Sequence, residues 1–398
     1  MNFKIKYYLI FLCVVFFSCT NTMSVKNEKK GKLTANYQLV ASNEKRILLD
    51  YETAPQPPYM QMIEGYSGKQ ILTLLNPYKN AIYFYDYENA VFTGKVEYEK
   101  EGPNGIIRLA GYYIENMDSI YVFCWSTRQL VLTDSTGLVK QRISLIDNRE
   151  ITSDWAYYYP QYEFTMVNPL IKKQGKIILP GMQPVKITDS LIHQFKFTSC
   201  VDMKTGKVEF MHTYPYELYG SNTQWESPWY MQPYQALLPT GEFVFSFPIS
   251  HNVYIVSYDA TDYKTVYAGS NVAGTIRSID DSRRRIPVDI IRSHFLRHDI
   301  YAAILHDPYR HLYYRYMLQA NPAATTNTHW KEKQVVVIIM DEHFEYLGET
   351  AIGTCEKWNW GNSFVTSEGL TMEYIDQDAD PEEQYIILKT FTVEKINK

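Results

Sequence analysis

Residues 237–247 read LLPTGEFVFSF, a turn closing on Gly241 and followed by a strand of alternating side chains. Glycine allows the backbone of a hairpin turn, and a period of two is typical of a β-strand. Five other segments have this plan: EGYSGKQILTL (64–74), IENMDSIYVF (114–123), IKKQGKIILP (171–180), LHDPYRHLYYR (305–315) and VTSEGLTMEYI (365–375). Gly68, Gly175 and Gly369 hold the turn in three of them, and Asp118 and Arg310 replace glycine in the other two. The stretch therefore predicts one hairpin of a repeat.

A second pattern follows the first five copies, namely an alternating strand that ends at an aspartate and then turns. The aspartates are Asp86, Asp134, Asp202, Asp259 and Asp341. The period is about 60 residues, and insertions at 180–195 and 319–333 account for its length. Four antiparallel strands repeated six times predict an all-β fold, a six-bladed β-propeller with four-stranded blades. Two stacked β-sandwiches are the alternative, but six copies in phase favour the ring.

The sixth unit lacks an outer strand, because the chain stops soon after EQYIILKTFTVEK (383–395). Residues 37–51, YQLVASNEKRILLDY, precede the first complete unit and have the character of a strand. We expect this N-terminal strand to complete the last blade and close the ring, which removes the exposed sheet edges of an open array.

The first residues resemble a bacterial lipoprotein leader. Lys4 and Lys6 precede an uncharged apolar run at 7–17, too short to span a bilayer, and the run leads into Ser18-Cys19. We predict a signal peptide at 1–18, lipidation of Cys19, a lipidated flexible tether at 19–36 and a single propeller domain at 37–398. An ordinary secretory signal with a chance cysteine is the alternative. Residues 20–24 lack an acidic stretch after the cysteine, which favours an outer-membrane anchor facing the periplasm.

The charge of the chain argues against nucleic acid as a partner. Loss of Lys4 and Lys6 with the leader changes the net charge from −5 to −7, whereas nucleic-acid binding domains are usually basic. Cys124, Cys200 and Cys355 would remain with Cys19 after cleavage, without CxxC spacing. Three cysteines allow one disulfide at most, and we expect buried apolar side chains.

The sequence resembles uncharacterised lipoproteins of Bacteroidota-type bacteria, built as six-bladed propellers of the TolB-like or NHL-like kind. The resemblance is carried by the end of the leader at Cys19, by EGPNG (101–105) and by DPYR (307–310) with YYR (313–315). It covers nearly the whole mature chain. That family is a domain of unknown function, so the resemblance implies a fold and supplies no catalytic residues.

Motifs for catalysis or metal binding are weak. His294 and His298 are four residues apart but lack an HExxH sequence, so solvated or core histidines are the simpler interpretation. Asp376, Asp378 and Asp380 have the spacing that opens a calcium loop, yet Pro381 stands where the loop needs glycine. We interpret 376–380 as a solvated hairpin loop of the sixth blade, and the arginines at 283–285 as a solvated loop. No cofactor and no metal site are predicted.

The tryptophans suggest a ligand site at the mouth of the channel. Most of them fall in segments that lead into blades, and such connections lie on one face of a propeller. The predicted rim residues are Asn104, Trp155, Trp229, Arg315, Trp358 and Trp360. Indole faces beside polar groups suit a glycan or a peptide. The alternative is that these rings are wedges between blades.

Two functions follow from this interpretation. The first is a non-catalytic binding or scaffold protein, attached to the membrane through Cys19, that holds a glycan, a peptide or an envelope protein at the rim. The second is a propeller enzyme such as a metal-dependent lactonase, for which Glu101, Asn104 and Asp154 are the available ligands.

One charged side chain lies in a predicted strand. In the strand after the DPYR turn, Tyr313, Arg315 and Met317 share one face. Both faces of a blade pack on neighbouring blades, so we expect Arg315 between blades or towards the channel. There it needs a carboxylate or carbonyl partner.

Overall fold

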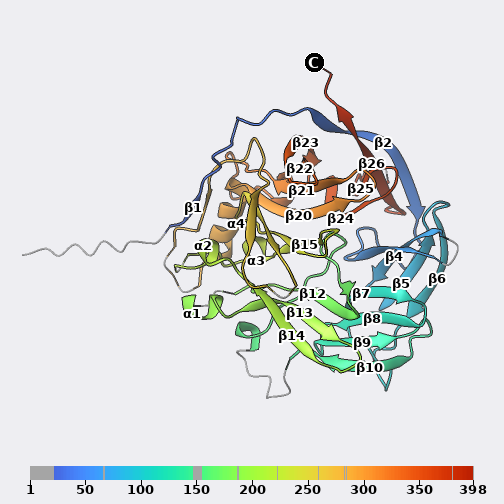
Figure 1. Cartoon of the computed structure of the whole chain (residues 1–398). Helices are drawn as coiled ribbons and strands as arrows, with labels where there is room; N and C mark the ends of the chain where they lie inside the picture. The colour runs from blue at the N-terminus through green and yellow to red at the C-terminus, as the bar shows by residue number, and fades with distance from the viewer. Residues whose placement is uncertain are drawn as a thin grey trace, which may run out of the picture.

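The computed structural model describes residues 22–65, 68–146, 155–185, 188–221, 223–258, 260–281, 283, 285–378 and 380–397. It has six four-stranded antiparallel sheets that follow one another around a ring in chain order (Figure 1). The predicted all-β, six-bladed propeller with four-stranded blades is confirmed.

Each of the first five blades uses four strands that are consecutive along the chain. Blade 1 contains β3 (Met60–Glu64), β4 (Gln70–Asn76), β5 (Ala81–Asp86) and β6 (Val91–Glu97). Blade 2 contains β7 (Leu109–Asn116), β8 (Ser119–Cys124), β9 (Gln129–Thr133) and β10 (Val139–Ser144). Blade 3 contains β11 (Ile171–Lys173), β12 (Lys176–Pro180), β13 (Lys196–Asp202) and β14 (Val208–Thr213). Blade 4 contains β15 (Tyr234–Leu237), β16 (Phe243–Ser246), β17 (Asn252–Val256) and β18 (Lys264–Tyr267). Blade 5 contains β20 (Ile300–Asp307), β21 (Leu312–Leu318), β22 (Gln334–Asp341) and β23 (Tyr346–Thr354).

Burial explains the difference between central and outer strands. The third strand of blade 5, β22, has the sequence QVVVIIMD and is buried along all but its ends, as expected for a strand covered on both faces. The outer strand β6, VFTGKVE, is mostly exposed. The blades therefore pack through their middle strands and leave their outer edges to solvent.

Blade 6 is built from both ends of the described chain. Its strands are β24 (Trp358–Val365), β25 (Leu370–Tyr374), β26 (Tyr385–Lys395) and β2 (Tyr37–Leu48), in that order. The N-terminal strand β2 runs antiparallel to β26, from Tyr37 opposite Lys395 to Leu48 opposite Tyr385. The predicted closure of the ring by the N-terminal strand is confirmed.

A segment of blade 3 fills the axis of the ring. Residues 163–170 interrupt the inner side of this blade and reach the inner strands of alternate blades. Phe164 packs on Gly111 of β7, where a Cβ atom would come within 2.4 Å of its ring. The Val167 amide donates to the Gly361 carbonyl of β24, and the Asn168 side chain accepts from the Gln235 amide of β15. A segment that touches blades 2, 4 and 6 at once must lie on the axis.

Residues 22–36, which we call the strap, follow the outside of blades 4 and 5 before entering β2 (Figure 1). Its short strand β1 (Ser24–Val25) pairs with β19 (Ile276–Arg277). The Asn27 side chain donates to the carbonyls of Ser270 and Ala273. The prediction of a flexible tether is therefore wrong for the strap, because its backbone and amide groups are hydrogen-bonded to the blades. Cys19 and residues 1–21 lie outside the described residues.

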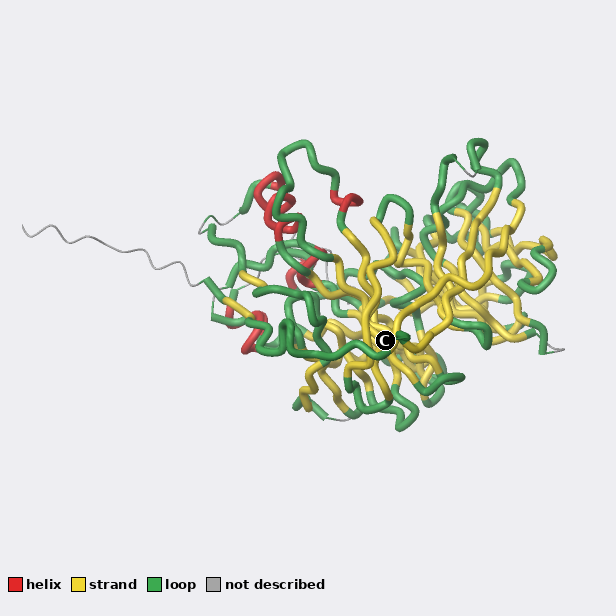
Figure 2. Tube along the Cα trace, turned by 90° about the horizontal axis from the view of Figure 1, so that it is seen from above, coloured by secondary structure: helices red, strands yellow, loops and turns green. Residues whose placement is uncertain are grey.

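The helices occupy connections and insertions. They are α1 (Asp189–Ile192), α2 (Tyr216–Tyr219), α3 (Pro228–Met231), α4 (Val288–Arg297), and the 3₁₀ turns η1 (Trp155–Tyr157) and η2 (Trp330–Glu332). Figure 2 shows most of the helical residues gathered on one side of the molecule. The predicted insertions at 180–195 and 319–333 hold α1 and η2. In the described part of the chain, no helix is long and apolar enough to cross a membrane.

Smaller features also bear on the predictions. Cys124, Cys200 and Cys355 are free and buried.

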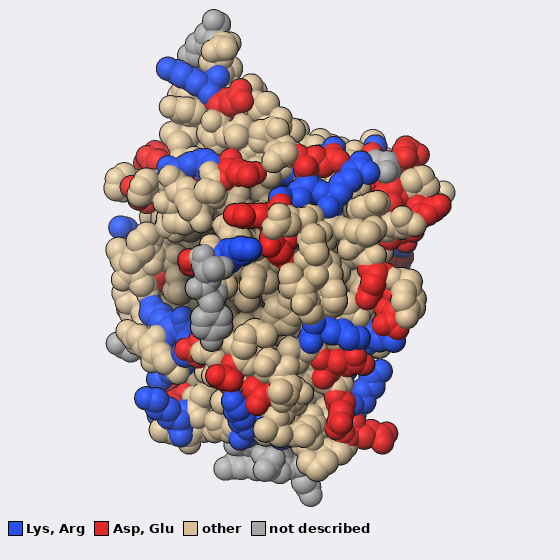
Figure 3. Space-filling view, turned by 90° about the vertical axis from the view of Figure 1, so that its right-hand side faces the viewer, with Lys and Arg blue, Asp and Glu red and all other residues tan. Residues whose placement is uncertain are grey.

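In the DPYR turn of blade 5 the left-handed residue is His311, with φ of 56°, so the turn ends one residue later than its alignment with the glycines suggests. On the side of the ring in Figure 3, lysine and arginine alternate with aspartate and glutamate, and this face shows no basic patch of the kind that nucleic acid needs.

Candidate functional site

Two of the predicted rim tryptophans meet at a cavity of about 260 Å³. Trp358 and Trp360 begin β24, and Trp330 of η2 joins them at the cavity wall. Lys331 of η2 lies beside Trp330. The other walls come from the connection between β2 and β3, from the axial segment and from blade 6; they include Gln56, Pro57, Pro58, Thr165, Asn359 and Asn362. The cavity therefore lies where blade 6, the segment at 163–170 and the insertion of blade 5 meet.

The tryptophans at this cavity differ in how far they are packed. Trp358 is 7% exposed, and its ring lies 4.7 Å from that of Tyr374 and 5.2 Å from that of Phe391. Trp360 is half-buried, with an edge contact to Tyr234 at 5.7 Å. Trp358 is therefore largely a wedge inside blade 6, whereas Trp360 and Trp330 keep surface for a ligand.

A buried carboxylate lies behind the cavity wall. Glu373 of β25 is 2% exposed. Its Oε2 atom accepts from the side-chain amides of Asn359 at 2.6 Å and Asn362 at 2.7 Å, and its Oε1 atom accepts from the Gln56 amide at 3.1 Å. Burial raises the pKa of Glu373 to about 7, against these donors, which favour the charged form. A carboxyl group that titrates near neutral pH beside a cavity is a mark of functional sites.

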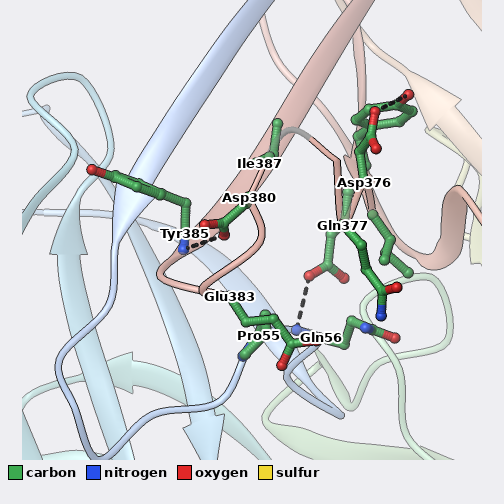
Figure 4. A pocket seen from close by; sticks show the side chains of 11 residues that line it. Pro55, Gln56, Asp376, Gln377, Asp380, Glu383, Tyr385 and Ile387 are labelled. Atoms are coloured by element: carbon green, nitrogen blue, oxygen red, sulfur yellow. Dashed lines mark hydrogen bonds between the residues drawn. The ribbon is translucent and has the colours of Figure 1, made fainter.

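A second, smaller pocket of about 30 Å³ lies on the other side of Glu373. Figure 4 shows Asp376, Gln377, Asp380 and Glu383 of the β25–β26 loop around it, with Pro55 and Gln56 on the opposite wall. A pocket of this size has room for a water molecule or two. Glu373 therefore lines this polar pocket, and its donors Asn359 and Asn362 connect it to the wall of the aromatic cavity.

Two carboxylates of this loop accept hydrogen bonds from residues of the same hairpin. Asp376 accepts from the Tyr374 hydroxyl and the Asp378 amide, and Asp380 accepts from the amides of Gln384 and Tyr385. The segment is the β25–β26 hairpin loop of blade 6, as the sequence predicts. Among the described residues, no three His, Cys, Asp or Glu side chains are grouped as metal ligands would be.

The aromatic cavity also contains an unsatisfied hydroxyl. Thr165 Oγ1 is buried, and no hydrogen-bond partner for it is found among the described residues. A buried hydroxyl without a partner costs about 1–3 kcal/mol. A ligand or water with a polar atom at this position would offset that loss.

A buried lysine fixes the η2 side of the cavity. Lys333 is 1% exposed, and its Nζ donates to the carbonyls of Phe295, Leu296 and His298 at the C-terminal end of α4. Burial lowers the pKa of Lys333 to about 7. These three bonds tie η2 to α4 and so position Trp330 and Lys331 at the cavity.

The remaining predicted rim residues lie elsewhere. Asn104 accepts from the Val139 amide of β10, at the outer strand of blade 2. Trp155 of η1 stacks under the guanidinium of Arg128 at 3.7 Å. Trp229 of α3 stacks on Phe295 of α4 at 4.1 Å. The structure brings together only Trp358 and Trp360 of the predicted set.

Arg315 lies between blades 4 and 5 with no exposed surface, not at the rim. Its Nε donates to Ser246 Oγ, and its terminal nitrogens donate to the carbonyls of Phe247, Ser250, His251 and Ala268. Its guanidinium also lies 3.9 Å from the centre of the Tyr301 ring. The expectation of a buried arginine between blades with carbonyl partners is confirmed, but these bonds engage the whole guanidinium, so it is not at a rim site.

The other motifs do not form a site. His294 of α4 stacks at 3.9 Å on His298, which follows the helix, and is hydrogen-bonded to the Tyr230 hydroxyl. Arg283 pairs with Asp281. Glu101 is exposed, and Asp154 lies outside the described residues.

Sequence reasoning missed Glu373, Thr165 and Lys333. A signal for Glu373 was present, because LTMEY (370–374) places a lone charge in the second strand of a blade. The same signal identified Arg315 in LYYRYML (312–318). Thr165 and Lys333 lie in irregular segments, where no periodicity distinguishes buried from exposed positions.

Two solved structures with TM-scores above 0.5 support the fold. A structure of a member of the DUF4221 family from Bacteroides vulgatus ATCC 8482 has a TM-score of 0.73 and 19% identity to this chain, covering 91% of this chain and 99% of that one. A "Putative exported protein" from Bacteroides fragilis NCTC 9343 has a TM-score of 0.54 and 10% identity, covering 92% and 98%. Virginiamycin B lyase from Staphylococcus aureus has a TM-score of 0.44 and 9% identity, covering 88% and 99%. No curated protein matches the chain.

The family described as "Domain of unknown function (DUF4221)" matches residues 36–351, from just before the closing strand β2 to the outer strand of blade 5. The matched region holds most of the ring that the structure shows. The chain is therefore a member of the DUF4221 family.

Proposed function

We propose that the protein is a non-catalytic, lipid-anchored binding protein of the cell envelope, and that its ligand is a glycan end group held in the cavity of Trp330, Trp358 and Trp360. The observation that carries the proposal is the joint presence of indole surface and side-chain amides at one cavity, with the Glu373 carboxylate behind the wall accepting from two of those amides. Sugar rings combine an apolar face with hydroxyl groups, which this combination matches.

The size of the cavity limits the ligand. Its volume of about 260 Å³ is below the roughly 300–1,000 Å³ of pockets for drug-sized ligands. One sugar ring or one peptide side chain fits better than a whole oligosaccharide. The Lys331 side chain at the wall adds a positive charge, so a sugar acid would be favoured over a neutral sugar.

The test is a titration followed by tryptophan fluorescence, with neutral sugars, sugar acids and short peptides as probes. We expect saturable binding of a sugar, weakened about tenfold or more by Trp360→Ala, which corresponds to about 1.4 kcal/mol. Trp229→Phe is the matched control, because Trp229 packs on Phe295 outside the cavity wall. Equal affinity of the Trp360→Ala variant and the native chain would show that the cavity is not the site. Binding of peptides but not of sugars would show that the ligand is a peptide and not a glycan.

The anchor is the second part of the proposal. The leader ending at Cys19 supports it, and a structural neighbour is named as exported. Cys19→Ala should abolish incorporation of labelled fatty acid. Resistance of the protein to protease added to intact cells would support the periplasmic face, whereas cleavage would place it on the cell surface.

A second candidate function is a hydrolase, which the raised pKa of Glu373 favours. A carboxyl group that titrates near neutral pH can act as a general acid or base. Assays of lactones and glycosides with and without a chelator separate the candidates. Turnover that is lost in Glu373→Gln would establish an enzyme, and turnover that is also lost on chelation would favour the metal-dependent lactonase.

A further inference from the structure

The docked strap limits where the propeller can lie relative to an anchor at Cys19. The Met23 amide donates to the Ser278 hydroxyl, and the Ser278 amide donates to the Met23 carbonyl. Val25 and Ser24 pair with β19, and the Gly31 amide donates to the Asn271 carbonyl. The chain is therefore held against blade 4 from Met23 onward.

Met23 follows Cys19 by four positions, and an extended chain spans at most about 3.6 Å per residue. Acyl chains on Cys19 would thus keep Met23 within about 15 Å of the membrane surface. This step rests on the proposed lipid anchor. A long flexible tether would leave the orientation of the propeller free, but the docked strap does not.

The surface around Met23 is basic, although the chain as a whole carries a net charge of −5. Residues 22–36 and 272–297 together contain ten lysines and arginines against four aspartates and glutamates. We call the exposed basic residues of these segments the basic edge; they are Lys26, Lys29, Lys30, Lys32, Arg277, Arg283, Arg285, Arg292 and Arg297.

Contacts show that these segments adjoin one another. Arg277 lies opposite Ser24 in the β1–β19 pair. Ile279 and Asp280, just after β19, line a cavity of about 470 Å³ together with Arg292 and Arg297 of α4. Val288, at the start of α4, is 74% exposed and adds an apolar side chain to the same side.

We infer that the basic edge is the surface on which the propeller rests against anionic phospholipid headgroups. Each lysine or arginine close to an anionic membrane contributes about 1 kcal/mol. An acyl anchor and a basic surface are the two signals that together give stable, oriented attachment.

The test uses the mature chain with Ser in place of Cys19, so that the protein surface alone determines binding to vesicles. We expect it to sediment with vesicles that contain phosphatidylglycerol and much less with phosphatidylcholine vesicles. The triple variant Lys26→Glu, Arg285→Glu and Arg292→Glu should weaken partition into anionic vesicles by about a hundredfold or more, from about 1 kcal/mol per charge.

The matched control reverses three exposed lysines elsewhere on the ring, Lys100→Glu, Lys196→Glu and Lys357→Glu. It changes the net charge equally and should keep most of the binding. An equal loss in both triple variants, or no preference for anionic vesicles, would overturn the inference. Thermal unfolding of both variants checks that each is folded.

Fatty-acid labelling of the native chain tests the lipid anchor separately from the basic edge. Absence of label at Cys19 would overturn the anchor, whereas the vesicle assay of the unacylated chain still decides the basic edge. Where label is present, a fluorophore on Val288→Cys should be quenched by lipid-borne quenchers. A fluorophore on Leu138→Cys, in the turn of blade 2 on the opposite side of the ring, should not.

Discussion

Arg315 and Glu373 are buried charges in equivalent places, the second strands of blades 5 and 6. Arg315 has five N–H groups, and all five have partners, four of them backbone carbonyls. Glu373 accepts three hydrogen bonds and lines a small polar pocket, and its three donors line the aromatic cavity. Arg315 joins two blades. The carboxylate oxygens of Glu373, by contrast, can accept further hydrogen bonds and lie next to a pocket.

Their pKa shifts differ in consequence. Burial lowers the pKa of Arg315 to about 10, so it stays charged at neutral pH. Burial raises the pKa of Glu373 to about 7, so its charge changes near neutral pH. The comparison teaches that a lone charge in a blade strand indicates burial, and that only its surroundings decide between a structural and a functional role.

The largest effect should come from Arg315→Met. It removes five hydrogen bonds from the core between blades 4 and 5, including those to the Ser250 and Ala268 carbonyls, and we expect a loss of about 3–5 kcal/mol in the free energy of unfolding. Urea denaturation measures it. Arg46→Met is the control, because Arg46 is exposed, and it should cost about 1 kcal/mol or less. A loss below about 1 kcal/mol in Arg315→Met would contradict the structural role.

Glu373→Gln should remove a pH dependence of stability. Because the folded pKa is above the unfolded value of 4.5, the folded protein holds the proton more tightly, and stability falls as pH rises from about 4.5 to about 7. The expected fall is roughly 3 kcal/mol, at 1.36 kcal/mol per pH unit. Unfolding curves at several pH values should show this slope in the native chain and a flatter profile in the variant. Identical profiles would mean that Glu373 is not protonated when folded.

Asn362→Ala should shift that profile. The Asn362 side chain donates to Glu373 and to the Pro57 carbonyl. Removing a donor to the carboxylate disfavours its charged form, so the pKa of Glu373 should rise and the loss of stability should extend to higher pH. We also expect a loss of about 1–2 kcal/mol at pH 5 from the Pro57 carbonyl left unpaired. A shift to lower pH would contradict the arrangement at Oε2.

The smallest effect should come from Thr165→Val at the cavity. Its hydroxyl is buried with no partner among the described residues, so removing it should raise the free energy of unfolding by about 1 kcal/mol. Thr73→Val is the matched control, because that hydroxyl donates to the Gln61 carbonyl and accepts from Tyr112, and it should cost about 1–2 kcal/mol. Equal losses would indicate that Thr165 is hydrogen-bonded after all.

The sequence was sufficient for the ring because its signals are local and repeated. A turn such as the one at Gly241 and the alternation after it predict a hairpin, and six copies predict the propeller. Closure by β2 followed from a missing strand in the last unit. The burial of Arg315 followed from its place in an alternating strand.

The docking of the strap could not be predicted, because its partners are distant in the chain. Asn27 bonds to Ser270, 243 positions away, and a polar segment such as TMSVKNEKK is equally typical of a free linker. The prediction of one shared rim site was incomplete for a similar reason. Trp155, Trp229 and Trp360 have similar sequence contexts. Only the structure shows that Trp155 packs against Arg128 and Trp229 against Phe295, whereas Trp360 lies at a cavity.

The segment that fills the axis gives the ring a connection that propellers built only from neighbouring blades lack. Val167 joins blade 3 directly to Gly361 of blade 6 on the far side, one residue after Trp360, and Thr165 of the same segment lines the cavity. A ligand that displaces Trp360 would therefore act on the Val167–Gly361 hydrogen bond between blades 3 and 6. Residues 163–170 therefore couple the wall of the cavity to blades that are not its neighbours in the ring.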